Sequence, residues 1–443
     1  MNPALNIGVV TQYYAPDPQW IPTSLARELA RRGHNVRVLT TYPHYATGKV
    51  WHGYKQQLHL DEADGPVAIR RVPIVPSHSR NAIGRILNYL SFAITSRLEG
   101  DFLKGADVIY VYSTPMTVAE GPRVWQKKWG LPFLLHVQDL WPDSVTNSGM
   151  LGRMARGIAN FLIPIWLRSI YARASEVVAI APRMRQMLGW QGVPEKKCSV
   201  VFNWANELDG AASTFDTEPA EERDRAGLCL LYAGNLGVMQ DLDNVLVAMS
   251  LVRDLPNVLL RVAGSGVVEQ HLKSLAKQLQ LQNVEFLGRL ESDELRTLYE
   301  WADFQLITLK NLMIFEGAIP SKLQAGLANG LPAITTVHGD VSDIICSERL
   351  GFVAEPENSQ SIADALRDAY RMSPSERHSM SCRAKTYYAN NMSQRQSVDH
   401  IEALLRLAAQ NKEKGSCHGL SRKDGSRHRR DRLIRARHSQ DDA

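Results

Sequence analysis

The sequence has few cysteines, and their arrangement argues against both a disulfide framework and a zinc site. Five cysteines are scattered over 443 residues, with an odd total and no CxxC pair. Disulfide scaffolds and structural zinc sites usually show paired, regularly spaced cysteines. The pattern indicates a reducing compartment and predicts a cytoplasmic protein.

Long apolar runs are also missing. No stretch of 18 apolar residues occurs, and the nearest approach, residues 157–172, contains Arg168. A spanning helix needs about 20 such residues. A strand-like segment, LNIGVV, begins at Leu5, where a signal peptide would have basic and then apolar residues. We therefore expect neither a transmembrane helix nor a cleaved signal peptide.

Excess charge of one sign is confined to the C-terminal tail. Residues 412–443 carry ten Lys or Arg and five Asp or Glu, which accounts for the whole net charge of +5. The balanced charge of the other residues does not favour nucleic-acid binding. The tail is almost free of apolar residues and is predicted to be disordered.

The sequence does contain a regular alternation of short apolar runs with amphipathic stretches. The predicted strands are 5–12, 35–40, 67–74, 106–113, 132–138, 176–182 and 199–203, followed by 228–234, 257–264, 283–288, 303–308, 331–336 and 351–355. Strands that alternate with helices predict parallel sheets covered on both faces. The fold class is therefore α/β.

A polar segment divides this alternation into two similar parts. We predict an N-terminal Rossmann-like acceptor and membrane-side domain (1–204), a linker (205–227), and a C-terminal Rossmann-like donor domain (228–390). A C-terminal helix (391–410) and a basic tail (411–443) follow. Two such doubly wound domains would face each other across a central cleft, with ligands outside the carboxyl ends of the strands.

The loop after the first strand, TQYYAPDPQWIP, has no GxGxxG pattern. This argues against an NAD or FAD enzyme of the usual kind, because that pattern lets the backbone approach a pyrophosphate.

The second domain opens with two glycine-containing turns. Gly234 and Gly237 lie near Asn235 and Gln240, and the next turn holds Gly264 and Ser265. Backbone N–H groups at such turns can bind phosphate oxygens. The alternative is that the glycines merely permit tight turns.

The segment 314–336 is the most informative. A loop with Glu316 leads through Pro320 into a helix, and Pro320 suits the first helical turn. Lys322 would then lie beside the positive end of the helix dipole, where its charge favours a departing diphosphate. A solvated lysine after a capping proline is the simpler alternative.

Six segments in order give the chain a resemblance to glycosyltransferase family 4, in the bacterial polysaccharide subgroup that includes the colanic-acid and L-fucosamine transferases. They are GHNVRVLTTYPHYATGKV, LLHVQDLWPDS, VVFNWANE, LLYAGNLGVMQDLDNVLVA, VAGSGVVEQHL and PSKLQAGLANGLPAI. The resemblance covers about residues 5–410 and implies the GT-B fold, retention of anomeric configuration and no bound metal. It also implies that the final helix returns to the first domain.

The resemblance also implies roles for individual residues. Glu316 takes the place of the first of two signature glutamates, near the transferred sugar, whereas Gln324 replaces the second, which contacts the ribose. Asn235 and Gln240 stand where many members have an Arg/Lys pair for the diphosphate. Lys322, Arg289 and backbone amides are the possible substitutes, and Ser321 completes the nucleotide-sugar candidates.

In the first domain, LLHVQDLWPDS ends a strand where the family often carries a His-Asp pair. The alignment leaves two readings. We favour Asp139 as the cleft-facing residue, and His136 is either a ligand contact or a core histidine.

Two stretches, 79–98 and 150–174, mix arginines with aromatic and aliphatic residues. Helices of this kind can lie in the headgroup region of an anionic membrane, although they can also pack on the sheet. We expect contact with the inner face of the plasma membrane.

The sequence therefore predicts a retaining glycosyltransferase of the hexosyl or N-acetylhexosaminyl type. It would move a sugar from UDP or GDP to a polyprenyl-diphosphate-linked saccharide in exopolysaccharide, capsule or O-antigen biosynthesis. No cofactor, metal or nucleic acid is expected. The alternatives are a nucleotide-sugar 2-epimerase, which would react without an acceptor, and a non-catalytic nucleotide-sugar-binding paralogue, which the Gln324 substitution encourages.

Overall fold

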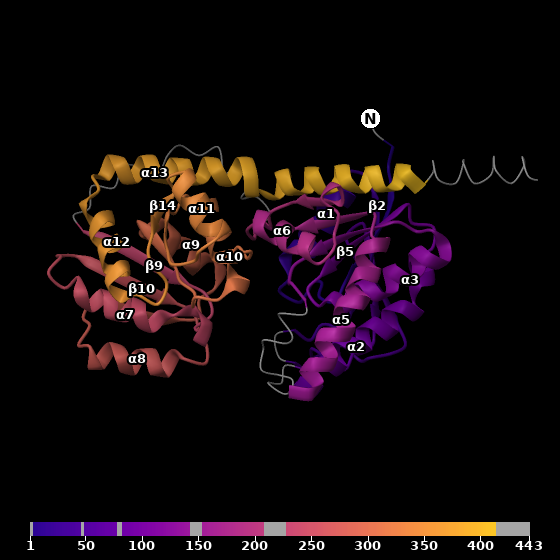
Figure 1. Cartoon of the computed structure of the whole chain (residues 1–443), viewed down its shortest axis with the longest axis horizontal. Coiled ribbons are helices and arrows are strands. Elements are labelled where there is room, and N and C mark those ends of the chain that lie inside the picture. The colour runs from indigo at the N-terminus through magenta and orange to yellow at the C-terminus, as the bar shows by residue number, and fades with distance from the viewer. Residues whose placement is uncertain (1–2, 46–47, 78–81, 142–152, 208–226, 413–443) are drawn as a thin grey trace, which may run out of the picture. The chain divides into compact units, whose positions relative to one another are not determined.

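The computed structural model describes residues 3–45, 48–77, 82–141, 153–207 and 227–412 (Figure 1). The chain divides into two compact units. Unit 1 takes Met1–Asp139, Met150–Val177 and Ile401–Ala443, and unit 2 takes Leu140–Gly149 and Val178–His400. Most of the predicted tail and linker, namely 413–443 and 208–226, lies outside the described residues, as do the arginine side chains at 153 and 156.

The first sheet has eight strands in the order β3-β4-β2-β1-β5-β6-β7-β8. Their bounds are β1 Asn6–Thr11, β2 Asn35–Thr41, β3 Leu60–Asp64, β4 Val67–Val72, β5 Val108–Ser113, β6 Phe133–Val137, β7 Glu176–Ala179 and β8 Cys198–Val200. Strand β1 pairs in parallel with β2 and β5, and all six residues of β5 are buried. This confirms the prediction that continuous apolar runs form central parallel strands.

Strand β3 departs from the expected parallel sheet. It pairs antiparallel with β4 at the edge, and its sequence, LDEAD, alternates between half-buried and exposed positions. The prediction missed this strand because it is short and acidic, although such charge is common on edge strands.

The helices that accompany this sheet are α1 Trp20–Arg31, α2 Ala82–Leu98, α3 Glu120–Trp129, α5 Arg153–Arg173 and α6 Pro182–Trp190. Single 3₁₀ turns occur at η1 Gly100–Leu103, η2 Met116–Ala119 and η3 Glu195–Lys197. Helix α2 packs on α3, and α3 packs on α5 (Figure 1). Pro164 lies inside α5.

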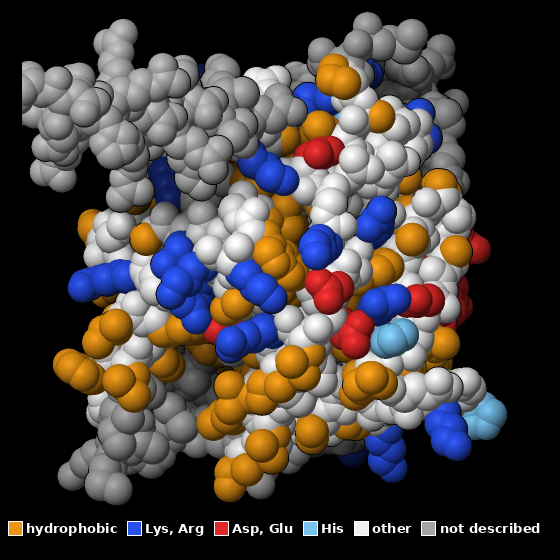
Figure 2. Space-filling model, turned by 90° about the vertical axis from the view of Figure 1, so that its right-hand side faces the viewer, with side chains coloured by type: hydrophobic (Ala, Val, Ile, Leu, Met, Phe, Trp, Pro, Cys, Tyr) orange, Lys and Arg blue, Asp and Glu red, His pale blue; other side chains and the backbone are white. Residues whose placement is uncertain are grey.

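Helices α2 and α5 leave large apolar side chains in solvent. On α2 these are Ile83, Leu87, Leu90, Ile94 and Leu98, and on α5 they are Phe161, Leu162 and Ile165. The spacing on α2 places its five residues in one stripe along the helix. Figure 2 shows a face of the molecule on which hydrophobic side chains gather in the lower part, together with Lys and Arg side chains. Within the described residues, no helix is long and apolar enough to cross a bilayer.

The second sheet has six strands, all parallel, in the order β11-β10-β9-β12-β13-β14. They are β9 Leu228–Ala233, β10 Val258–Ala263, β11 Val284–Gly288, β12 Phe304–Ile307, β13 Ala333–Thr335 and β14 Gly351–Val353. Each confirms a predicted strand to within a few residues. The order has the reversal of a doubly wound sheet, with β9 between β10 and β12.

The helices that accompany the second sheet are α7 Leu242–Leu251, α8 Glu269–Gln278, α9 Ser292–Trp301, α10 Ser321–Ala328, α11 Asp340–Ser347, α12 Ser359–Arg371 and α13 Pro374–Tyr387. Short turns lie at η5 Val238–Gln240, η6 Met313–Phe315 and η7 Tyr388–Met392. Pro320 is the N-cap of α10 rather than a residue of its first turn, so the helix begins one residue later than predicted. Lys322 remains in the first turn.

A last helix covers residues 394–412, and its part from Ile401 belongs to unit 1. There Glu402 accepts hydrogen bonds from Arg32 at 2.9 Å and Arg406 at 2.7 Å, and it lies 3.2 Å from His34. Arg406 also donates to the carbonyl oxygen of Pro3 at 2.7 Å. These contacts hold the end of the helix against α1 and the start of β2.

Candidate functional site

In unit 2, Lys322 reaches from the first turn of α10 to the carboxyl end of β9. Its Nζ donates to the hydroxyl of Tyr232 at 2.7 Å and to the side-chain oxygen of Gln240, and it lies 4.3 Å from the centre of the Tyr232 ring. Desolvation lowers the pKa of Lys322 to about 8. Among the described residues no carboxylate forms an ion pair with this lysine. The site therefore holds a partly desolvated cation that an anionic ligand would stabilise.

The two glycine-containing turns pack directly on each other. A Cβ added at Gly264 would overlap the carbonyl oxygen of Gly234, and one at Gly266 would overlap the backbone of Leu236. The amide of Leu236 donates to the carbonyl oxygen of Ser265 at 3.0 Å. The close approach of the two turns therefore leaves no room for a side chain at Gly264 or Gly266. Gly234 has a separate reason, since a Cβ there would lie 2.5 Å from Cε of Lys322.

The other predicted nucleotide-sugar residues lie around the same edge of the sheet. Asn235, Ser265, Arg289 and Ser321 are exposed, and Gly237 is half-buried. Arg289 directly follows Gly288, whose carbonyl oxygen accepts the amide of Gly264 at 2.6 Å. The structure therefore brings together the residues after β9, β10 and β11 and the start of α10.

Gln324 is 2 % exposed, and its amide makes no hydrogen bond with any residue that the structure describes. Its amide atoms are not among the fully enclosed polar atoms that lack a partner, so a ligand hydroxyl could reach them and complete their hydrogen bonding. The placement is compatible with the ribose contact that the resemblance implies for this position.

Glu316 has a different environment from Lys322. It follows η6, and its carboxylate accepts a hydrogen bond at 3.0 Å from Arg183 of the same unit. Its side chain is 39 % exposed, so it remains accessible to a ligand. No described contact joins the Glu316 carboxylate to Lys322.

In unit 1, Asp139 lies in a cavity of about 410 Å³ at the carboxyl end of the sheet. Tyr13, His44, Thr114 and Asp139, which line this cavity, follow β1, β2, β5 and β6 respectively. Solvent reaches the Asp139 carboxylate, but the surrounding protein atoms desolvate it and raise its pKa to about 6. An acceptor or sugar hydroxyl could hydrogen-bond to this carboxylate.

His136 is fully buried within β6 and does not line that cavity. Its Nδ1 lies 2.6 Å from the hydroxyl of Tyr110, on the neighbouring strand β5. Of the two readings of the His-Asp pair, the geometry places Asp139 at the cavity and His136 in the sheet.

Sequence reasoning missed the residues that shape the cavity. Asn88 of α2 donates to His44 at 3.2 Å and to the carbonyl oxygen of Val75 at 2.8 Å, and it accepts from Gln12 at 2.7 Å. Asp17 accepts the amides of His44 and Tyr45 at 3.2 and 2.9 Å. Burial raises the pKa of Asp17. The signal lay in two segments. TQYYAPDPQW had been noted only for its lack of a GxGxxG pattern, and TYPHYATG only as part of the family resemblance.

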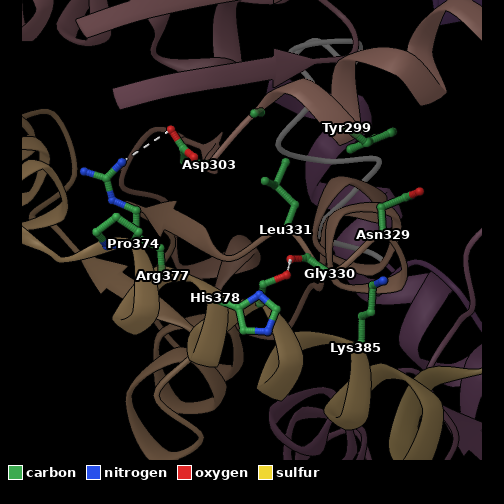
Figure 3. Close-up of a pocket in the computed structure, with 11 residues that line it drawn as sticks. Tyr299, Asp303, Asn329, Gly330, Leu331, Pro374, Arg377, His378 and Lys385 are labelled. Atoms are coloured by element: carbon green, nitrogen blue, oxygen red, sulfur yellow. Dashed lines mark hydrogen bonds and ion pairs between the residues drawn. The ribbon is translucent and has the colours of Figure 1, made fainter. Parts of the chain in front are cut away.

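A smaller cavity of about 70 Å³ lies at the amino ends of the strands of the second sheet (Figure 3). Asp303 and Leu331 line it just before β12 and β13, and Arg377 of α13 lies 3.6 Å from Asp303. Arg377 also donates to the carbonyl oxygen of Gly227 at 2.7 Å. This cavity lies between α13 and the amino ends of the strands, whereas Lys322 lies at their carboxyl ends.

Comparison with known proteins identifies the two halves separately. Residues 19–204 match the family described as glycosyl transferase 4-like domain, and residues 216–387 match glycosyl transferases group 1. One relative, the putative colanic acid biosynthesis glycosyl transferase WcaI of Escherichia coli strain K12, is 27% identical over 352 residues. That similarity covers 77% of this chain and 85% of the relative.

Solved structures with the same fold include sucrose-phosphate synthase from Thermosynechococcus elongatus. It has 14% identity and a TM-score of 0.66, with 91% of this chain and 98% of that chain covered. Another is Anabaena Alr3699/HepE in complex with UDP and glucose, at 12% identity and a TM-score of 0.63, covering 91% and 99%. Such likenesses establish the GT-B fold. The chain therefore belongs to the glycosyltransferases that join a glycosyl transferase 4-like domain to a group 1 domain.

Proposed function

We propose that this glycosyltransferase moves a hexosyl or N-acetylhexosaminyl group from UDP or GDP to a polyprenyl-diphosphate-linked saccharide, with retention of configuration. The observation that carries the proposal is Lys322, a desolvated cation without a carboxylate partner among the described residues, beside two glycine turns and the start of α10. Such a site suits a nucleoside diphosphate. The relative named for colanic acid biosynthesis and the neighbour solved with UDP and glucose support the reaction class.

In the proposed reaction, the bond between the anomeric carbon and the diphosphate breaks, and the electron pair leaves with the diphosphate oxygen. Lys322 and the amides of the helix start and turns stabilise this charge. A bond to the acceptor oxygen forms on the same face of the sugar, and the acceptor proton passes to the departing phosphate. Glu316 positions the sugar hydroxyls and Asp139 contacts the sugar or acceptor.

We also propose that the donor binds without a divalent metal, because Lys322 and the backbone amides supply the positive charge that a metal would provide. A chelator such as EDTA should then leave nucleotide affinity unchanged. A large loss of affinity that Mg²⁺ restores would contradict this part of the proposal.

Membrane contact at the inner face of the plasma membrane is part of the proposal. It is supported by the apolar stripe of α2, by Phe161, Leu162 and Ile165 of α5, and by the exposed Arg97 and Arg168 near them in sequence. Apolar side chains that enter the headgroup region and arginines that attract anionic lipid act together in peripheral binding.

The first experiment is a thermal-shift screen with UDP, GDP, ADP and their sugars. A ligand at about 100 times its Kd stabilises the native state by about 2.7 kcal/mol. We expect one nucleotide to raise the melting temperature, and Lys322→Ala to remove most of that rise. Lys385→Ala is a matched control, because Lys385 lines the small cavity at the amino ends of the strands.

A lack of response to every nucleotide would contradict the donor site and favour a different role for the fold. Turnover of a bound nucleotide-sugar into its epimer without any acceptor would favour the 2-epimerase. Tight binding with neither hydrolysis nor transfer would favour a non-catalytic paralogue.

A further inference from the structure

Helix α2 borders two hollows in unit 1, on either side of one hydrogen bond. Arg85, Asn88 and Tyr89 line the 410 Å³ cavity that contains Asp139, whereas Ser91 and Thr95 line a groove of about 450 Å³. The segment after β4 is shared in the same way, since Ser77 lines the cavity and Val75 the groove. The bond from Asn88 to the carbonyl oxygen of Val75 joins the two. The hollows are therefore neighbours along one helix.

The cavity offers a cation with no partner. Within the described part of the chain, Arg85 makes no hydrogen bond or ion pair. Two carboxylates lie nearby: Asp17 accepts the amides of His44 and Tyr45, and Asp139 lines the same cavity without an ion pair to Arg85. A guanidinium free to donate in a cavity favours a phosphate, whose oxygens match its fork of N–H groups.

The groove has a mainly apolar exposed lining. Its polar groups bond to one another: Gln56 exchanges two hydrogen bonds with the backbone of Ile74, at 3.0 and 2.7 Å. Ser91 accepts the amide of Val75 at 3.0 Å, and Thr95 donates to the carbonyl oxygen of Pro73 at 2.9 Å. The exposed lining that remains is mainly apolar, since Leu58 is 75% exposed and Val75 is 46% exposed, with the exposed side chain of Gln57 beside them. Such a surface fits an aliphatic chain better than a sugar.

We infer that α2 binds the anionic lipid portion of the acceptor, with a phosphate on Arg85 in the cavity and the first part of the hydrocarbon chain in the groove beside Leu58 and Val75. The inference rests on the proposed function, because it takes unit 1 as the acceptor side. The hydrocarbon and the phosphate would then be bound in adjacent hollows that α2 borders, with Leu58 and Val75 of neighbouring segments completing the groove. Each methylene buried in the groove would raise affinity about fourfold.

The test is calorimetric titration of the full chain with farnesyl diphosphate, which has both a chain and a charge, and with inorganic diphosphate, which has only the charge. We expect Arg85→Gln to weaken farnesyl diphosphate at least about tenfold, and Arg85→Lys to recover part of the loss. Leu58→Asp should weaken farnesyl diphosphate by a similar factor and leave inorganic diphosphate unchanged. Leu407→Asp is the matched control, because Leu407 is 53% exposed on the last helix.

Lys322→Ala separates this inference from the donor site. If farnesyl diphosphate binding is lost in Lys322→Ala and kept in Arg85→Gln, the lipid occupies the donor site and the inference is wrong. It is equally wrong if Arg85→Gln and Leu58→Asp bind like the wild type, or if the wild type shows no binding up to millimolar concentration. The nucleotide screen reports on the proposed function independently, through unit 2 alone.

Discussion

Asp139 and Lys322 share an unusual property at the scale of single residues. Each carries its charge where the surroundings disfavour it, and neither forms an ion pair with a described residue. Groups whose pKa is shifted by desolvation without a compensating partner are common at functional sites, because a bound ligand can supply the missing charge or hydrogen bond. The two residues mark one such position in each unit.

Replacing Asp139 should stabilise the protein. Its pKa of about 6 lies above the ordinary value, so the folded state holds the proton more tightly than the unfolded state. The protein therefore loses stability as the pH rises from the ordinary pKa of an aspartate toward 6. Above pH 6 the ionised carboxylate remains unfavourable, including at pH 7.5. Asp139→Asn should raise the melting temperature at pH 7.5 and raise it less below pH 5.

A matched control for this experiment is Asp368→Asn, since Asp368 is 57% exposed and pairs with Arg371 along α12. It should change stability by less than about 0.5 kcal/mol at either pH. A melting temperature of Asp139→Asn below that of the wild type at pH 7.5 would show that the carboxylate stabilises the fold.

Sequence reasoning found Lys322 and, in Gly234 and Gln240, part of its surroundings, but not Tyr232. The lysine could be predicted because Pro320 marks a helix start and places the charge in the first turn. Tyr232, which contacts it, lies inside a predicted strand 90 positions earlier, and nothing in the local pattern reveals that the two meet. Arg85 was missed for the same reason, because the periodicity of α2 does not say which face meets the loops after β1 and β2.

At the scale of elements, the turns after β9 and β10 depend on each other. Gly264→Ala should destabilise unit 2 by about 3 kcal/mol, because the added Cβ overlaps the carbonyl oxygen of Gly234 and the residue has φ +144°. Gly237→Ala should cost less than about 1 kcal/mol, since its φ of −105° suits alanine and the nearby Asn235 amide can rotate away. Thermal unfolding of both variants measures the difference, and equal costs would contradict the packing argument.

The last helix contacts unit 1 through charged side chains as well as through the buried Ile401 and Leu405. Hydrogen bonds from Arg32 and Arg406 help hold the pKa of Glu402 at about 2, against the cost of burial. Its contribution is present above the ordinary value near 4.3 and is lost as the pH falls toward 2. Glu402→Gln should therefore destabilise the docking of residues 401–412 by about 1–3 kcal/mol at pH 7 and by much less at pH 3.

Hydrogen exchange of residues 401–412 measures this docking directly. Glu300→Gln is the control, because Glu300 is 66% exposed in a single pair with Arg296. Unchanged protection of the helix in Glu402→Gln would show that apolar packing, and not the charge cluster, holds it in place.

Buried strands were easier to predict from the sequence than exposed ones. Strands β1, β5 and β6 were found because buried parallel strands are continuous apolar runs. Strand β3 was missed because LDEAD satisfies no such pattern and owes its conformation to antiparallel pairing with β4. Pairing with another strand can give an extended conformation to residues whose intrinsic strand propensity is low.

At the scale of the whole molecule, the exposed stripe on α2 predicts vesicle binding. The protein should sediment with vesicles of phosphatidylglycerol and phosphatidylethanolamine, and less with phosphatidylcholine or at high salt. The double variant Leu87→Glu, Ile94→Glu should abolish binding, since both side chains are exposed on that stripe. Leu407→Glu should bind normally. Retained binding of the double variant would exclude α2 as the contact.

The position of Lys322 has a consequence for the proton balance of the whole molecule. With a pKa of about 8, the free protein carries this proton on only about half of its copies at pH 8. The diphosphate of a bound nucleotide-sugar has no proton that titrates in this range and would raise the pKa of Lys322, so each binding event should take up to about half a proton from the buffer at pH 8 and almost none at pH 6.5. Titrations in buffers of different ionisation enthalpy would reveal the uptake as a buffer-dependent heat. The same experiment on Lys322→Met should show no such dependence, which would make the lysine a chemical reporter of whether its site is occupied.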